Sequence, residues 1–201
     1  MKPLQKIGMQ KGWIYEVIVS TYGGDEPHSA PMGVWTDDFD ALNVEIYTEG
    51  ATLKNIMELQ EFAVNLVNDV TVFYDSLFDR ESVEYRDSPN IRAPILLKAP
   101  AVIEARLTGL EKRGGRFRVE CLPVHIEANG PVNLINRAKA TAIESLILAT
   151  RLPYLGREKV RDALRENHRV VKKVAPGSEY ERIVEKLVAA QHGLAADERS
   201  G

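Results

Sequence analysis

The spacing of apolar residues divides the chain near residue 130. Before that point β-branched and aromatic residues alternate with polar ones in short runs, and after it apolar residues recur every three or four positions. Alternation predicts strands, whereas the longer spacing predicts helices. We therefore expect an α+β protein in which residues 1–130 form an antiparallel β-barrel and residues 131–201 form a small C-terminal helical subdomain.

Five runs in the first part have the pattern of strands. In the first of them Trp13, Tyr15, Val17 and Val19 share one face, opposite Glu16 and Ser20, as in a half-buried strand. The runs span residues 12–21, 28–36, 41–48, 99–110 and 115–127. The last two are joined by a segment ending in two glycines, which is typical of a hairpin turn that needs positive φ. A barrel is favoured because closing the sheet leaves no exposed edge.

The stretch from residue 52 to 70 is compatible with two structures. Ile56, Leu59, Ala63 and Leu66 could line one long helix, whereas residues 62–67 alone have a strand pattern. We prefer a short helix over 52–59, a turn at 60–61 and then a strand. A further short helix is expected over residues 71–78, with Asp69 near its start.

The tail has helical spacing throughout. Its first helix would present one apolar stripe, formed by Ile135, Ala138, Ala142, Leu146 and Ala149. Pro153 would end this helix, and a second would follow Gly156. Ser178 and Glu181 have the spacing of a capping box, which predicts the start of a third helix.

Composition places the chain among ordinary globular proteins, with 44% hydrophobic and 27% charged residues among 201. There is no apolar run of the roughly 20 residues that a membrane-spanning helix needs, and the N-terminus does not resemble a secretory signal, so we expect a cytoplasmic protein. Cys121 is the only cysteine and lies in an apolar strand pattern, where a small buried side chain is expected. The four histidines are far apart in sequence, so no metal site is expected.

The net charge of −3 hides an uneven distribution. Residues 37–87 contain thirteen acidic residues against Lys54, Arg80 and Arg86, whereas residues 151–173 contain eight basic residues against three acidic ones. The basic segment could contact nucleic-acid phosphates, but it lacks interleaved aromatic residues and a recognition motif. We expect a solvated helical face rather than nucleic-acid binding.

The segment YTEGATLKN has the features of an anion site. It runs from the end of a strand through Gly50 into the expected helix start at Thr52, so unpaired backbone N–H groups would meet the side chains of Thr48, Thr52 and Asn55, and Lys54 could add its ammonium group. The alternative is that Thr52 is an ordinary helix cap. On this segment alone the alternative is favoured.

A second segment, HSAPMGVW, favours a ligand site over an ordinary helix cap. Pro31 cannot donate to a sheet ladder and Gly33 has no side chain, so we expect an irregular strand with free backbone groups that a flat molecule can approach closely. A bulged edge strand is the alternative.

The order of these motifs resembles that of the FMN-binding split-barrel proteins, the flavin reductase-like superfamily. The resemblance rests on a first strand ending in Ser-Thr, then His-x-Ala-Pro-Met-Gly-Val, then Thr-x-x-Gly-x-Thr-x-x-Asn, then Phe-Ala-Val-Asn-Leu-Val-Asn-Asp. The later NRAKATAIESLILATRL resembles the tail helix of one uncharacterised branch, domain-of-unknown-function family 447. The resemblance covers nearly the whole chain.

The resemblance implies a homodimer with FMN bound at or near the subunit interface. The strand holding Ala30, Met32, Gly33 and Val34 would offer backbone groups to the edge of the isoalloxazine ring, and His28 is the titratable group proposed near the ring. The phosphate would be held by Thr48, Gly50, Thr52 and Asn55. Asn65 would contact the ribityl chain or the ring, and Asn136 and Arg137 could reach the phosphate. In one departure, Ala51 stands where related loops often have a serine, which removes one donor.

Two main functions are compatible with these residues. The first is an FMN-dependent oxidoreductase that moves electrons from a reduced nicotinamide nucleotide to an acceptor, since the flavin itself supplies the redox chemistry. The alternative is a protein that binds or carries FMN without turnover. A nucleic-acid adaptor acting through residues 151–173 is a third and weaker hypothesis.

Overall fold

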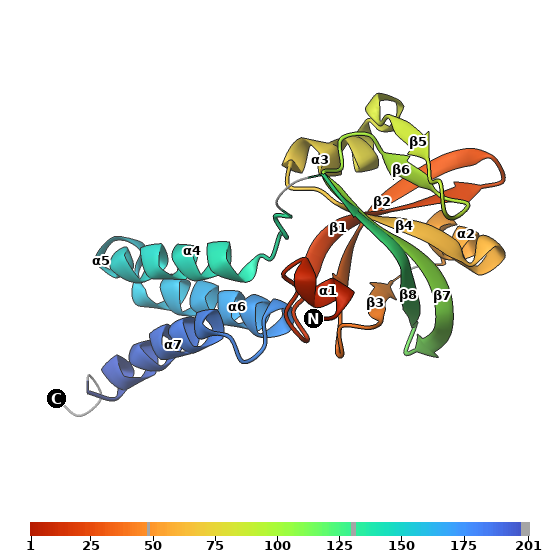
Figure 1. Ribbon diagram of the computed structural model, residues 1–201. Coiled ribbons are helices and arrows are strands. Elements are labelled where there is room, and N and C mark those ends of the chain that lie inside the picture. Colours follow the sequence, from red (N-terminus) through yellow and green to blue (C-terminus); the bar gives the residue numbers. More distant parts are fainter. Residues whose placement is uncertain (48, 130–131, 198–201) are drawn as a thin grey trace. The chain divides into compact units, whose positions relative to one another are not determined.

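The computed structural model describes residues 1–47, 49–129 and 132–197 of the chain. They form two compact units, the barrel unit (Met1–Lys11 and Tyr15–Ile135) and the helical unit (Gly12–Ile14 and Asn136–Gly201) (Figure 1). The boundary between the two units therefore lies after Ile135, five residues later than expected, and the helical unit also includes the short segment Gly12–Ile14. Among the described residues, no helix combines the length and the apolar character needed to cross a bilayer.

Within the described residues of the barrel unit, six antiparallel strands close into a barrel in the order β1, β2, β3, β8, β7, β4. The barrel strands are β1 (Tyr15–Gly23), β2 (Glu26–Trp35), β3 (Leu42–Ile46), β4 (Glu61–Leu66), β7 (Ala101–Arg113) and β8 (Arg116–Ala128). A separate two-stranded sheet consists of β5 (Tyr85–Asp87) and β6 (Pro94–Leu96). The predicted α+β fold, a split barrel followed by helices, is confirmed.

The barrel unit also contains short helices. They are α1 (Pro3–Lys6), α2 (Ala51–Leu59), α3 (Val70–Phe78) and the 3₁₀ helix η1 (Arg80–Ser82). The ambiguous stretch therefore forms a helix, a turn and a strand, as preferred from the sequence. Gln60 makes the turn in the left-handed conformation, and the Asp69 carboxylate accepts a hydrogen bond from the Thr71 backbone N–H as the cap of α3.

Strand β1 is buried on both faces, which differs from the half-buried strand expected from its alternation. Ile18 and Ser20 are both fully buried. Ile18 packs with Val72 of α3 and Leu96 of β6, so these segments cover the face that alternation left to solvent. The polar Ser20 is accommodated because its hydroxyl donates to the Pro94 carbonyl.

Strand β2 differs from the irregular strand expected from Pro31 and Gly33. It pairs with β1 in one unbroken register from Tyr15↔Val34 to Gly23↔Glu26. On its other edge only Val34 and Trp35 pair with β3, so in the described part of the chain the edge over residues 27–33 has no strand partner. Because backbone groups along a strand point alternately to its two edges, this split leaves free groups beside α2.

The hairpin of β7 and β8 forms as the sequence predicts. Gly114 and Gly115 make its turn with φ of +54° and +83°, a conformation that glycine adopts without strain. Cys121 is fully buried on β8, and burial raises the pKa of its thiol to about 12, so the thiolate is strongly disfavoured. The predicted structural role of this cysteine is confirmed.

The helical unit consists of helices packed around small apolar side chains. The helices are α4 (Ala138–Thr150), α5 (Leu152–Leu155), α6 (Arg157–Val174) and α7 (Glu179–Asp197). Ala138 and Ala142 lie in the core as predicted, but Ile135 precedes α4 and Leu146 is 46% exposed, so the expected apolar stripe is wrong at these two positions. Ser145 takes the buried place and donates its hydroxyl to the Thr141 carbonyl.

The predicted capping box at the start of α7 is present. The Glu181 backbone N–H donates to Ser178 Oγ at 3.2 Å, and the Glu181 carboxylate accepts from the Gly177 N–H at 2.6 Å. Two otherwise unpaired donors at the helix start are thereby satisfied.

Candidate functional site

A cavity of about 450 Å³ opens in the barrel unit between β2, β3 and the beginning of α2. It is lined by Glu16, His28, Ala30, Pro31, Met32, Gly33, Glu45, Ile46, Tyr47, Gly50, Ala51, Thr52, Leu53 and Arg80. Its volume falls in the range of about 300–1,000 Å³ that is usual for small-molecule sites. The two segments singled out in the sequence, HSAPMGVW and YTEGATLKN, therefore meet at one cavity.

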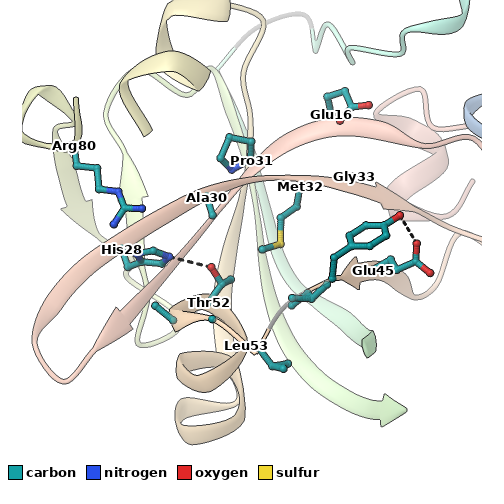
Figure 2. A pocket seen from close by; sticks show the side chains of 14 residues that line it. Glu16, His28, Ala30, Pro31, Met32, Gly33, Glu45, Thr52, Leu53 and Arg80 are labelled. Atoms are coloured by element: carbon teal, nitrogen blue, oxygen red, sulfur yellow. Dashed lines mark hydrogen bonds between the residues drawn. The ribbon is translucent and has the colours of Figure 1, made fainter. Parts of the chain in front are cut away.

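The wall formed by β2 combines small or apolar side chains with free backbone. Ala30, Pro31, Met32 and Gly33 lie along the strand edge that has no ladder partner among the described residues (Figure 2). Pro31 reduces the number of donors on the strand, whereas the remaining N–H and C=O groups are available to a ligand. Such a wall suits a flat heteroaromatic molecule with hydrogen-bonding groups at its rim.

The opposite wall is the N-terminus of α2. Gly50 is the N-cap in extended conformation, and no side chain caps the helix. The N–H groups of the first turn therefore face the cavity without intrahelical partners, at the positive end of the helix dipole. The alternative in which Thr52 caps the helix is wrong, because Thr52 is the second helical residue.

Thr52 instead lies beside His28. The Nε2 atom of His28 is 3.0 Å from Thr52 Oγ1, which joins β2 to α2 across the cavity (Figure 2). Burial lowers the pKa of His28 below its ordinary value of 6.5, and the positive charge of Arg80 lowers it further. The neutral imidazole is therefore favoured at pH 7 in the absence of an anion.

Arg80 is a basic cavity residue that was not predicted from the sequence, and Glu16, Glu45, Ile46, Tyr47 and Leu53 were missed as well. It is the first residue of η1 and points toward His28 (Figure 2). The only sequence signal was that Arg80 is one of three basic residues in the acidic stretch 37–87. That signal does not reveal that a segment about 50 residues beyond β2 returns to the same cavity.

Six of the predicted site residues line the cavity. Those that line it are His28, Ala30, Met32, Gly33, Gly50 and Thr52. Thr48 lies outside the described residues. Arg137 directly precedes α4 in the helical unit, so its assignment to the phosphate stays a prediction. Val34 is 1% exposed and belongs to the barrel core.

The predicted asparagines have structural hydrogen bonds instead. Asn65 is fully buried, donates to the Ile18 carbonyl and to Ser20 Oγ, and accepts from the Leu96 N–H, so it does not reach the cavity. Asn55, 6% exposed, donates to Thr21 Oγ1 at 3.0 Å.

Asn136 is likewise committed within the helical unit. Its amide donates to the carbonyls of Ile14 and Val174, both at 2.8 Å, and accepts from the Ala138 N–H. These bonds fix the start of α4. Asn136 thus holds three backbone segments together, and its suggested contact with a phosphate stays a prediction.

Family models and solved structures agree with this architecture. Residues 15–130 match the N-terminal domain of DUF447, described as a protein of unknown function, and residues 136–189 match the DUF447 C-terminal model. The fold is that of the FMN-binding, flavin reductase-like split barrels. The chain belongs to the DUF447 family, as its motifs suggested.

Three solved structures illustrate the similarity. An FMN-bound DUF447 protein from Methanosarcina mazei has 24% identity and a TM-score of 0.55, and the match covers 94% of this chain and 99% of that one. An FMN-binding protein from Thermus thermophilus, with bound 1-cyclohex-2-enone, has 13% identity and a TM-score of 0.51 over 57% of this chain and 70% of that one. The NADH:FAD oxidoreductase SgcE6 from Streptomyces globisporus has 14% identity and a TM-score of 0.51 over 62% and 81%.

Proposed function

We propose that this chain is a flavoprotein that binds FMN in the cavity between β2 and α2. The observation that carries the proposal is the meeting of an unpaired strand edge and an uncapped helix N-terminus across one cavity of about 450 Å³. FMN has a flat ring with polar edges and a charged phosphate, and the two walls match these two parts. The known FMN-binding proteins of the same fold support the proposal.

The phosphate would bind at the start of α2. The backbone N–H groups of Ala51, Thr52 and Leu53 and the hydroxyl of Thr52 provide neutral donors, and the helix dipole favours an anion there. Ala51 contributes its N–H but no hydroxyl. This assignment keeps Gly50 and Thr52 from the predicted set and replaces the Asn55 side chain with backbone donors.

The isoalloxazine ring would lie against β2. Met32 and Pro31 offer apolar surface for the ring, and the free backbone groups of the strand can hydrogen-bond its carbonyl and nitrogen atoms. Leu53 adds a further apolar contact from α2. These residues would orient the ring and keep water from one of its faces.

We further propose that the flavoprotein is an oxidoreductase that accepts electrons from a reduced nicotinamide nucleotide. FMN, when bound, supplies the electron-transfer chemistry, and the protein supplies binding and orientation. His28 lies 3.0 Å from Thr52 at the α2 end of the cavity, where the phosphate is assigned, so its imidazole would act at the phosphate end of the ligand and not as a proton donor to the ring. Several proteins of this fold are called oxidoreductases, including the one from Streptomyces globisporus.

The test is anaerobic titration of the purified full chain, first with FMN and then with NADH or NADPH. We expect FMN fluorescence to be quenched on binding and the visible absorbance of the flavin to bleach on reduction. Bound flavin that neither nucleotide reduces would contradict the nicotinamide-dependent reaction and favour an FMN carrier. Failure to bind FMN at all would contradict both.

A homodimer and a cytoplasmic location belong to the same proposal. Helix α3 exposes large apolar side chains, namely Val70, Tyr74, Leu77 and Phe78. Helix α3 ends at Phe78, two residues before Arg80 of the cavity wall, so a second copy covering the end of α3 would lie near the flavin site. Light scattering of the purified protein tests this, and a monomeric mass with FMN bound would contradict it.

A further inference from the structure

The Arg80 guanidinium has no protein partner in the described part of the chain. No hydrogen bond or ion pair involves its side chain there, although it lines the cavity. Other arginines of the barrel unit are paired: Arg86 lies 2.6 Å from Glu127, Arg92 lies 3.0 Å from Asp25, and Arg106 lies 2.7 Å from Glu61. In an acid-rich region, a cation left unpaired in a cavity wall is available to an anionic ligand.

The segment carrying Arg80 is fixed to the barrel by hydrogen bonds. The Val83 N–H donates to the Arg80 carbonyl, and Ser82 Oγ donates to the Asp79 carboxylate at 2.7 Å. Further on, the Tyr85 hydroxyl donates to Ser29 Oγ at 2.8 Å, and Ser29 directly follows His28 on β2. The backbone that carries Arg80 is therefore held at a fixed position relative to the strand that carries His28.

Arg80 supplies a positive charge at one end of the cavity, and the adjacent His28, neutral without a ligand, can take up a proton when an anion binds there. Arg80 is the charged group that acts on His28, Thr52 from α2 is neutral, and Thr21, opposite His28 on β1, is neutral as well. The acidic side chains of the lining, Glu16 and Glu45, lie at the other end (Figure 2). An elongated ligand with one anionic terminus would thus be oriented along the cavity.

We propose that Arg80 and His28 together bind the terminal phosphate of FMN and make the cavity select FMN over riboflavin. This inference rests on the proposed function, to which it adds the residues that set the phosphate preference. A guanidinium and an imidazolium form charge-assisted hydrogen bonds with a phosphate, which are roughly twice as strong as neutral ones. Riboflavin has the same ring and ribityl chain but ends in a neutral hydroxyl in place of the phosphate, so it forms no charge-assisted hydrogen bond through that end.

The experiment compares dissociation constants of FMN and riboflavin for the purified full chain by fluorescence quenching. The variants are Arg80→Gln, His28→Gln and, as a control of equal charge change, Arg92→Gln, whose guanidinium contacts Asp25 rather than the cavity. We expect the unaltered protein to bind FMN at least about tenfold more tightly than riboflavin. Arg80→Gln should weaken FMN about tenfold or more and riboflavin less than about twofold, with Arg92→Gln changing neither.

Arg80→Lys provides a second measurement that does not depend on removing the charge. It should bind FMN with intermediate affinity, because lysine keeps the charge but loses the planar fork that suits a phosphate. Thermal melting of each variant shows whether it is folded.

The outcomes separate this inference from the proposed function. If FMN and riboflavin bind equally well to the unaltered protein, or if Arg80→Gln weakens both to the same extent, the phosphate assignment is overturned while flavin binding stands. If neither flavin binds the unaltered protein, the proposed function is overturned and the phosphate assignment with it.

Discussion

The basic residues of the helical unit and those of the barrel unit are used differently. On α6, Arg169 lies 2.6 Å from Glu166, and Arg161 lies 3.7 Å from Glu158, each one turn away on the same helix. In the barrel unit Arg80 lines a cavity without an ion pair among the described residues. Some cations of a dense run are thus paired within their own helix, whereas a single arginine in an acid-rich segment is left for a ligand.

This contrast changes how the charge of the sequence is interpreted. The basic segment 151–173 is the most conspicuous charge feature of the chain, yet its described ion pairs are typical of a solvated helical face. Arg80 is inconspicuous in sequence because no pattern surrounds it. The position of a charge relative to a cavity is more informative here than the number of charges.

A second contrast concerns two asparagines that perform the same task in the two units. Asn65 links β4, β1 and β6 inside the barrel, and Asn136 links the backbone at Ile14, Val174 and Ala138 in the helical unit. Asn65 is fully buried, but Asn136 is only partly buried. If the asparagine is removed, water can therefore replace the lost hydrogen bonds at position 136 but not at position 65.

Replacing these asparagines gives the largest expected effect. Asn65→Ala should lower the free energy of unfolding by about 3 kcal/mol, because the Leu96 N–H is left buried without its acceptor, whereas Asn136→Ala should cost about 1–2 kcal/mol. Denaturant unfolding of both variants measures the difference. A smaller loss for Asn65→Ala than for Asn136→Ala would contradict the role of burial.

The next effect concerns ligand binding in the barrel unit. Thr52→Val keeps the shape of the side chain but removes its hydroxyl from the α2 end of the cavity, so we expect FMN to bind about tenfold more weakly. The control is Thr108→Val on β7, an exposed threonine whose hydroxyl donates to the Glu120 carbonyl at 3.2 Å. Equal FMN affinities for the two variants, measured by fluorescence titration, would place the anion elsewhere.

The smallest effect is the titration of His28. Because burial and Arg80 lower its pKa, the unfolded chain binds this proton more readily than the folded one. Stability contributed by neutral His28 should therefore be complete above pH 6.5 and decline as pH falls from there through the folded-state pKa.

NMR titration of the imidazole protons measures this directly, with His28→Gln used for assignment. The midpoint should lie below 6.5 in the ligand-free protein and should rise in Arg80→Gln, since a neighbouring positive charge is removed. A midpoint unmoved by Arg80→Gln would show that the two side chains do not interact.

Much of the fold could be predicted because local chemistry decides it. The alternation in β3, with Leu42, Val44 and Ile46 all buried, and the paired glycines of the β7–β8 hairpin act within a few residues of one another. The course of β1 was less predictable. Its second face is buried by α3 and β6, which follow much later in the chain, so alternation alone misjudged its exposure.

The cavity was predictable in part for the same reason. The segments containing Gly33 and Thr52 carry local signals, a glycine in a strand and a helix start, and both line the cavity. Whether an asparagine faces a ligand or the core depends on strand pairing that the sequence does not reveal, and Asn55 and Asn65 were misplaced on that account. Arg80 was missed because hydrogen bonds distant in sequence bring it to β2.

The cavity is built mainly from two stretches of chain, and Glu16 of β1 adds to its lining. Residues 28–53 supply both main walls, whereas Arg80 comes from a later stretch joined to the barrel by the hydroxyls of Tyr85 and Tyr22, which donate to Ser29 and Asp87. A related chain could therefore differ at residues 79–84 and bind an uncharged or differently charged ligand while its barrel stays the same. Sequence differences among relatives in this short segment would then indicate the charge of the ligand's terminal group rather than the nature of its ring.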